Sequence, residues 1–119
     1  MNRIFVEDIA RELHEAAERA RTIVLVSPYV KKSALAALLD PAAPFSRLTL
    51  VARALIGDFA NGFSDLEALS YAAGLGGRVL THPSLHAKYY RFDDTVYIGS
   101  ANLTANGTGL GLHGNLEML

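Results

Sequence analysis

Short apolar runs separated by helical segments constrain the fold of this chain most strongly. Thr22 to Val26 is a continuous run rich in β-branched residues, which is typical of a strand inside a parallel sheet. Residues 47–52 and 78–81 repeat the pattern, and residues 56–63, with two glycines, are expected to form a loop. Because strands that alternate with helices favour crossover connections, the order predicts an α/β fold, an α-β-α sandwich with a mixed, largely parallel sheet and helices on both faces.

The segments between these runs carry helical signals. Residues 7–21 place apolar side chains on one side of a helix and i,i+4 pairs of opposite charge on another. Ser33 is expected to cap a second, short helix. The capping box Ser64–Glu67 predicts a third helix over residues 65–73, and Gly74 suits its C-terminal cap.

The composition favours one soluble domain over residues 1–119. Half of the residues are apolar, 19% are charged and cysteine is absent, which excludes disulfides and thiolate metal sites. We expect no membrane span and no signal peptide, and take a cytoplasmic location as the default. The net charge of −1 counts against tight nonspecific nucleic-acid binding by the isolated chain, although a local basic cleft stays open. Residues 115–119 would begin another strand, which leaves open a longer parent protein with additional domains.

The most informative stretch is a predicted hairpin. Residues 85–92 and 95–98 are expected to be strands joined at Asp93-Asp94. Side chains two residues apart in a strand share a face, and the hairpin lays two such pairs side by side. The result is a predicted cluster of an imidazole, an ammonium, a hydroxyl and an amide, from His86, Lys88, Ser100 and Asn102.

This cluster suits a phosphodiester substrate. An imidazole acts as a nucleophile or as a general acid. An ammonium and an amide bind the non-bridging oxygens as negative charge develops on them in the transition state. Gly99 permits close approach of the backbone.

The spacing of these residues resembles that of a known family. His86, Lys88 and Asp93 follow a His-x-Lys-x4-Asp pattern, and a Gly-Ser-x-Asn pattern ends at Asn102. Together they resemble the HKD signature of the phospholipase D superfamily. The resemblance covers roughly residues 22–117, and three flanking segments are similar to the nuclease-type branch found in restriction endonucleases and attached to helicases: Ser27–Tyr29, Gly62–Leu69 and Asn115–Glu117.

The resemblance implies a fold, a mechanism and an assembly. The chain would be one HKD half of a phospholipase D-like fold and would act as a phosphodiesterase, a hydrolase that requires neither a metal nor another cofactor. The expected type is a nuclease domain, with DNA binding and endonuclease activity among its expected properties and with the substrate left open between DNA, RNA and lipid. In the family, one histidine attacks phosphorus to form a phosphohistidine, and a second protonates the departing oxygen and then activates water. His86 would take one of these roles, while Lys88, Ser100 and Asn102 bind phosphoryl oxygens. Glu117 matches the acidic residue that orients the histidine, and Asp93 is more structural than chemical in the family.

Two departures from the family pattern affect this interpretation. Five residues separate Asp93 from Gly99 where the family more often has six, so Asp94 is an alternative to Asp93. Only one motif is present, so an active enzyme must be a homodimer or half of a longer chain. Two other functions stay open: a phospholipase D or phosphatidyltransferase-type enzyme, and a non-catalytic dimerising module that binds nucleic acid.

The remaining histidines and cations have simpler interpretations. His113 lies in a glycine-rich loop without a lysine two residues later, and His14 and His82 have no evident partners, so all three are expected to be structural or loop residues. Lys31-Lys32 and Arg53 could contact a phosphate backbone or be ordinary solvated charges.

Overall fold

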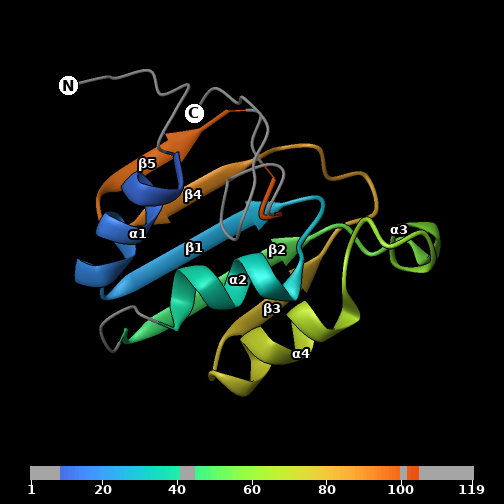
Figure 1. Cartoon of the computed structure of the whole chain (residues 1–119), viewed down its shortest axis with the longest axis horizontal. Coiled ribbons are helices and arrows are strands. Elements are labelled where there is room, and N and C mark those ends of the chain that lie inside the picture. The colour runs from blue at the N-terminus through green and yellow to red at the C-terminus, as the bar shows by residue number, and fades with distance from the viewer. Residues whose placement is uncertain (1–8, 41–44, 100–101, 105–119) are drawn as a thin grey trace.

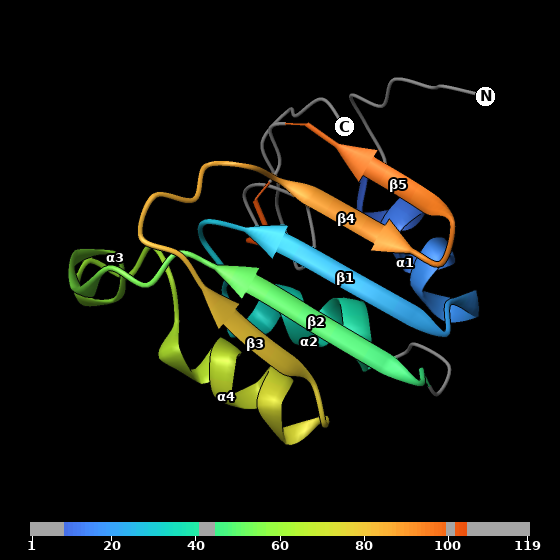
Figure 2. The same ribbon diagram turned by 180° about the vertical axis from the view of Figure 1, so that it is seen from behind.

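A five-stranded mixed sheet forms the centre of the molecule (Figures 1 and 2). The structure is a computed structural model that describes residues 9–40, 45–99 and 102–104. Its elements in chain order are α1 (Ile9–Arg19), β1 (Thr22–Ser27), α2 (Lys32–Leu39), β2 (Arg47–Ala52), α3 (Ile56–Ala60), α4 (Leu66–Gly74), β3 (Arg78–Thr81), β4 (Tyr89–Phe92) and β5 (Thr95–Ile98). The sheet order is β3-β2-β1-β4-β5, with β1, β2 and β3 parallel and with β4 antiparallel to both β1 and β5. The α/β class and the mixed sheet are confirmed.

Most of the predicted strands occur where the sequence placed them. β2, β3 and β5 have the predicted bounds, β1 extends one residue further to Ser27, and β4 and β5 form the predicted hairpin. The prediction that β4 begins at residue 85 is wrong, because the strand begins at Tyr89. Val26 is the last β1 residue paired with β4, and Tyr89 is its partner. Residues 85–87 therefore lie beyond the neighbouring strands and have no ladder to join.

The described helices α1, α2 and α4 lie on one face of the sheet, in front of it in Figure 1 and behind it in Figure 2. Burial alternates along β1, so that Ile23 and Leu25 are buried while Val24 and Val26 are only half-buried. The expectation that β1 is buried on both faces is therefore wrong for this structure. Within the described ranges, no helix forms the second helical layer of the sandwich.

The face of the sheet opposite these helices carries an apolar row. By strand register, one side chain from each strand lies in line: Ile98, Tyr89, Val26, Val51 and Leu80. Leu80 and Ile98 are exposed. We call this set the open-face row.

Tertiary hydrogen bonds replace the predicted helix caps. The Ser64 hydroxyl accepts a bond from Val30 N–H (3.0 Å) and donates to the Val30 carbonyl (3.1 Å), so it does not cap α4. Asp65 precedes α4 but its side chain makes no cap there; one carboxylate oxygen accepts from Lys32 N–H (2.8 Å) at the start of α2. Ser33 lies inside α2. Both cap predictions are wrong. At α4 the Ser64 hydroxyl is bound to Val30 instead, and at α2 the acceptor is the carboxylate of Asp65, which is distant in sequence.

Two further local predictions differ from the structure. Residues 56–60, expected as loop, form the short helix α3. Gly74 is the last residue of α4, and the glycine with a left-handed conformation is Gly76, at φ 81°. Gly77 packs so closely that an added Cβ would lie 2.7 Å from the Ala72 carbonyl oxygen. The glycine run therefore provides both a turn and a close helix–strand contact.

Candidate functional site

The candidate site lies at one end of the sheet. β1, β2 and β3 are parallel and end at the same edge, where the antiparallel strand β4 begins. Continuing the β1–β4 register by one residue from Val26 and Tyr89 places Lys88 opposite Ser27. On the other side of β4, Gly99 N–H donates to the Lys88 carbonyl (3.4 Å). The backbone of Lys88 is therefore held between the ends of β1 and β5.

Lys88 and His86 belong to the loop that leads into β4. Lys88 is half-buried, and its ammonium donates to the His86 carbonyl oxygen at 3.3 Å. His86 is exposed, and a turn from His82 O to Leu85 N–H (3.3 Å) precedes it. The expectation that both side chains share one strand face is not met, because both residues precede the strand. Their one contact in the structure is from the Lys88 ammonium to the backbone of His86, within a loop.

Asn102 is joined to the end of β1 by hydrogen bonds. Its side-chain oxygen accepts from the Ser27 hydroxyl (3.3 Å) and from Tyr29 N–H (3.5 Å). Leu103 N–H donates to the Ser27 oxygen (3.0 Å), and Lys31 N–H donates to Leu103 O (2.9 Å). An amide held by its oxygen can present its NH2 group to an anion. The same edge therefore positions Asn102, Lys88 and His86.

Ser27 belongs to a segment that the sequence marked as similar to the nuclease-type branch, but no role at the site was predicted for its side chain. It is fully buried, and its single hydroxyl proton is shared between the Tyr29 carbonyl oxygen at 2.7 Å and the Asn102 side-chain oxygen at 3.3 Å. Its position as a polar residue at the end of an apolar strand is a second sequence signal for it. One buried hydroxyl thus links β1, the turn after β1 and the segment that carries Asn102, and a buried hydroxyl without its partners would be costly.

Asp93 lies at the opposite end of the sheet. Its carboxylate accepts from Arg21 N–H (3.0 and 3.3 Å) and Thr22 N–H (2.9 Å), and its own φ is 54°. Four residues of extended chain separate it from Lys88, and the five steps between the two Cα atoms span roughly 16 Å at about 3.3 Å per residue. Asp94 is fully exposed at the same turn, with one carboxylate oxygen 4.0 Å from Arg91 Nη2. Neither carboxylate contacts His86 or Lys88, and Asp93 holds the start of β1.

Two predicted site residues, Ser100 and Glu117, lie outside the described residues, as does His113.

Two of the three cations considered for phosphate contact are paired within the protein. The Arg53 guanidinium donates twice to Asp58 (2.8 and 3.1 Å) and once to the Tyr29 hydroxyl (2.8 Å). The hydrogen bonds to Asp58 outweigh desolvation, so the pKa of Arg53 lies above its ordinary value. The Lys31 ammonium binds Asp65 (2.9 Å) and the Gly62 carbonyl (2.8 Å). Arg53 and Lys31 are therefore held in ion pairs, which neither of the two sequence interpretations included, while Lys32 is exposed.

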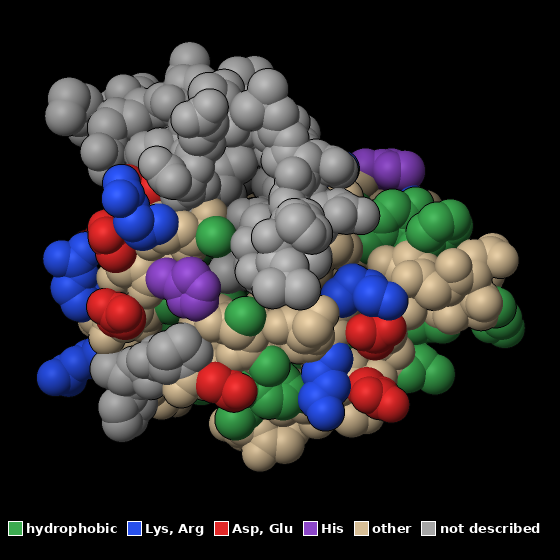
Figure 3. Space-filling model, viewed as in Figure 1, with side chains coloured by type: hydrophobic (Ala, Val, Ile, Leu, Met, Phe, Trp, Pro, Cys, Tyr) green, Lys and Arg blue, Asp and Glu red, His purple; other side chains and the backbone are tan. Residues whose placement is uncertain are grey.

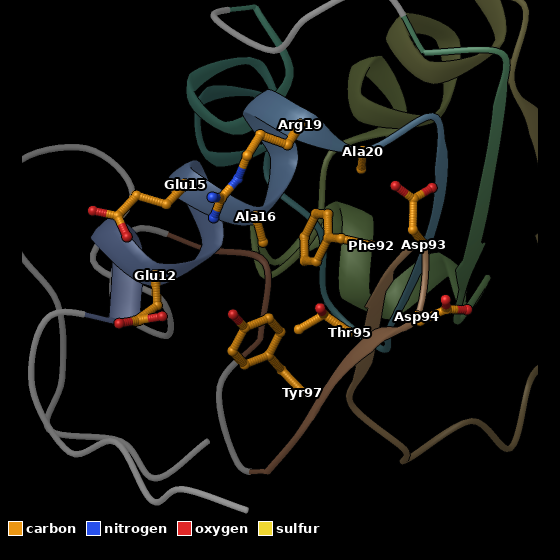
Figure 4. Close-up of a pocket in the computed structure, with 10 residues that line it drawn as sticks. All are labelled: Glu12, Glu15, Ala16, Arg19, Ala20, Phe92, Asp93, Asp94, Thr95 and Tyr97. Carbon is orange, nitrogen blue, oxygen red and sulfur yellow. The ribbon is translucent and has the colours of Figure 1, made fainter. Parts of the chain in front are cut away.

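A pocket of about 480 Å³ lies away from this edge, between α1 and the β4–β5 hairpin (Figure 4). Its polar lining is mainly acidic, from Glu12, Glu15, Asp93 and Asp94, with Arg19 as its cation. Like charges disfavour a phosphate there, so we do not assign it to the phosphodiester chemistry. In the described ranges, no group of three or more acidic or histidine side chains is placed to hold a metal ion. Among the helices that the structure describes, none is long and apolar enough to cross a membrane.

Comparisons with known proteins support the fold. No family model matches the chain, and no curated protein matches it in sequence. Among solved structures, NucT from Helicobacter pylori is similar, with a TM-score of 0.72 and 15% sequence identity. The match covers 99% of this chain and 82% of that chain. The chain therefore has the phospholipase D-like fold.

Proposed function

We propose that this chain is a metal-independent phosphodiesterase of the phospholipase D type, and that its substrate is a nucleic acid. One observation carries the proposal: His86, Lys88 and Asn102 belong to the HKD-like pattern of the sequence, and the segments that carry Lys88 and Asn102 both adjoin the end of β1 in a phospholipase D-like fold. The structural similarity to a nuclease with that fold favours a nucleic acid over a lipid.

The proposed chemistry has two steps. In the first, an imidazole nitrogen attacks phosphorus, a phosphorus–nitrogen bond forms, and the phosphorus–oxygen bond to the departing strand breaks. A second imidazolium gives its proton to that oxygen. In the second step, the now neutral imidazole takes a proton from water, which attacks phosphorus and breaks the phosphorus–nitrogen bond. The Lys88 ammonium and the Asn102 amide stabilise charge on the non-bridging oxygens, with Ser100 assisting.

The scheme requires two histidines at one phosphate, and this chain places one at the site edge. We therefore propose a homodimer in which the partner copy supplies the second His86. Glu117 is proposed to orient the imidazole. Asp93 is assigned a structural role, because its carboxylate is engaged with Arg21 and Thr22 at the other end of β4.

The decisive experiment is cleavage of end-labelled single-stranded and duplex DNA in excess chelator. Wild type should cleave, and His86→Ala should lose about 10²–10⁴-fold in rate, the usual contribution of an acid–base group, or more if it is also the nucleophile. His14→Ala, a histidine on α1, is the matched control and should retain wild-type activity. Activity that needs a metal, or that survives in His86→Ala, would disprove the proposal. Protein denatured in alkaline detergent, in which a phosphorus–nitrogen bond survives, should carry a labelled DNA strand on histidine in wild type only.

A further inference from the structure

The segment of residues 53–66, which we call the α3 arm, displays apolar side chains to solvent. Leu55, Ile56, Phe63 and Leu66 are 39, 87, 55 and 62% exposed. They are half of the eight large apolar side chains that are exposed in the part of the chain that the structure describes. Figure 3 shows apolar side chains gathered at the right-hand end, over α3. Concentrated apolar exposure of this kind marks an interaction surface more often than scattered exposure does.

Buried polar groups hold the α3 arm in place. The Arg53–Asp58 ion pair is nearly buried, with side chains 12 and 10% exposed. The Asp58 carbonyl accepts from Phe63 N–H (2.9 Å) and Ser64 N–H (3.1 Å), and Ser64 binds Val30 in turn. The arm therefore turns Arg53, Asp58 and Ser64 inward while four of its large apolar side chains face solvent, the reverse of the usual arrangement. Such an ordered arm presents its apolar side chains with little further loss of entropy on binding.

The α3 arm lies at the same edge as the candidate site. In Figures 1 and 2, α3 projects past the ends of β2 and β3, next to the loop that leads from β3 to β4. The Phe63 ring lies 5.7 Å from the Tyr29 ring, centroid to centroid. Tyr29 N–H is also a donor to Asn102. Contacts thus run without interruption from the arm to the proposed phosphate-binding amide.

We propose that the α3 arm is the surface through which two copies of this chain associate and complete the active site. The inference rests on the proposed function, since that chemistry needs a second His86 brought to this edge. A twofold axis beside the site uses the same patch on both copies, so each arm side chain contributes twice. The apolar and aromatic composition of the arm is that of an interface core.

The charge of the α3 arm argues against other occupants. Arg53, Asp58 and Asp65 are its charged residues, and each is in an ion pair, the last with Lys31. A nucleic-acid surface would present uncompensated cations to the phosphates. A membrane-binding segment would combine apolar residues with a basic polar face. A neutral, rigid and apolar surface beside an incomplete active site therefore fits a second copy of this chain.

The test is the oligomeric state of the full chain, measured by sedimentation equilibrium without substrate. Wild type should be a dimer at micromolar concentration, and Ile56→Asp should dissociate at least about a hundredfold more readily, as expected for a hot-spot side chain used twice. Leu66→Asp should act in the same direction. Ile98→Asp is the matched control: Ile98 is 65% exposed in the open-face row, and its replacement should leave the dimer intact. Far-ultraviolet circular dichroism verifies that each variant is folded.

Three results would overturn the inference. They are a monomeric wild type, an Ile56→Asp variant that dimerises as wild type does, and dissociation caused by Ile98→Asp alone. A fourth is cosedimentation of wild type, but not Ile56→Asp, with phosphatidylcholine–phosphatidylglycerol vesicles while both stay monomeric, which would make the arm a lipid-binding surface. A chain that dimerises through the arm yet cleaves no phosphodiester supports the arm as the dimer surface but disproves the proposed function and the completed active site with it, so the two failures are distinguishable.

Discussion

The two ends of β4 differ in what their polar side chains do. At the end that carries Asp93, the carboxylate is fully used by backbone N–H groups of Arg21 and Thr22, and the turn is fixed. At the other end, the buried Ser27 side chain holds the backbone at the end of β1. Lys88 and His86 lie in the loop before β4, and the His86 side chain is exposed. One sequence pattern therefore supplies a structural residue at one end of a strand and candidate reactive residues at the other.

The largest expected effect is a loss of cleavage activity from a substitution at the Lys88 end of β4. Lys88→Met should lower the rate of DNA cleavage by about 10²–10³-fold, because removal of one charge-stabilising donor at a reacting centre costs that much. The midpoint of thermal unfolding should change little, since the Lys88 ammonium contacts a backbone carbonyl of its own loop. Single-turnover cleavage and a thermal melt measure the two quantities. A large loss of stability with unchanged specific activity would remove the distinction between the two ends.

Ser27→Ala tests whether the site end depends on one buried hydroxyl. It leaves Leu103 N–H without its acceptor, so the free energy of unfolding should fall by about 1–3 kcal/mol. Cleavage should fall by roughly tenfold, because Asn102 loses a donor that positions it and about 1.4 kcal/mol corresponds to tenfold. Urea titration and the cleavage rate of fully folded protein measure these effects. Ser70→Ala, at an exposed position of α4, is the control and should be neutral in both assays.

Asp93→Ala should show the opposite pattern: the protein should lose stability and keep its cleavage activity. Loss of the bonds to Arg21 and Thr22 should cost about 1–2 kcal/mol in free energy of unfolding. Alanine also fits the φ of 54° poorly, whereas Asp93→Asn tolerates it and should cost less. Urea titration at pH 7 ranks the variants. If folded Asp93→Ala lost as much activity as Lys88→Met, Asp93 would belong to the chemistry.

The smallest expected effect concerns pH. Burial opposes ionisation of Asp65, but hydrogen bonds from Lys32 N–H and the Lys31 ammonium outweigh it and hold its pKa below the ordinary 3.8. The unfolded chain then takes up the proton at a higher pH than the folded one. The stabilisation is present above about pH 4 and is lost as pH falls through the folded-state pKa. The stability difference between wild type and Asp65→Asn should therefore shrink on acidification, and a difference that is constant from pH 7 to pH 2.5 would contradict it.

Local sequence was sufficient to predict an element of structure where one residue type dominates a short segment. The apolar β-branched runs fixed β1 and β2, and Asp93-Asp94 marked the hairpin, because strand propensity and turn chemistry act over a few residues. The His86, Lys88 and Asn102 pattern was visible for the same reason. The start of β4 was not, since it depends on where the neighbouring strands end, which no local pattern records.

Tertiary structure decided the partners of the polar side chains. Ser64 and Asp65 look like a local capping box, yet they bind Val30 and Lys32, because a hydrogen bond acceptor serves whichever N–H group the fold brings near. Ser27 was inconspicuous until Leu103 and Asn102 were packed against it. The sequence by itself determined most of the strand positions and the candidate reactive groups of the proposed site. The tertiary structure alone decided that Asp93 stays apart from them and that the α3 arm faces solvent beside them, because these relations join residues far apart in the chain.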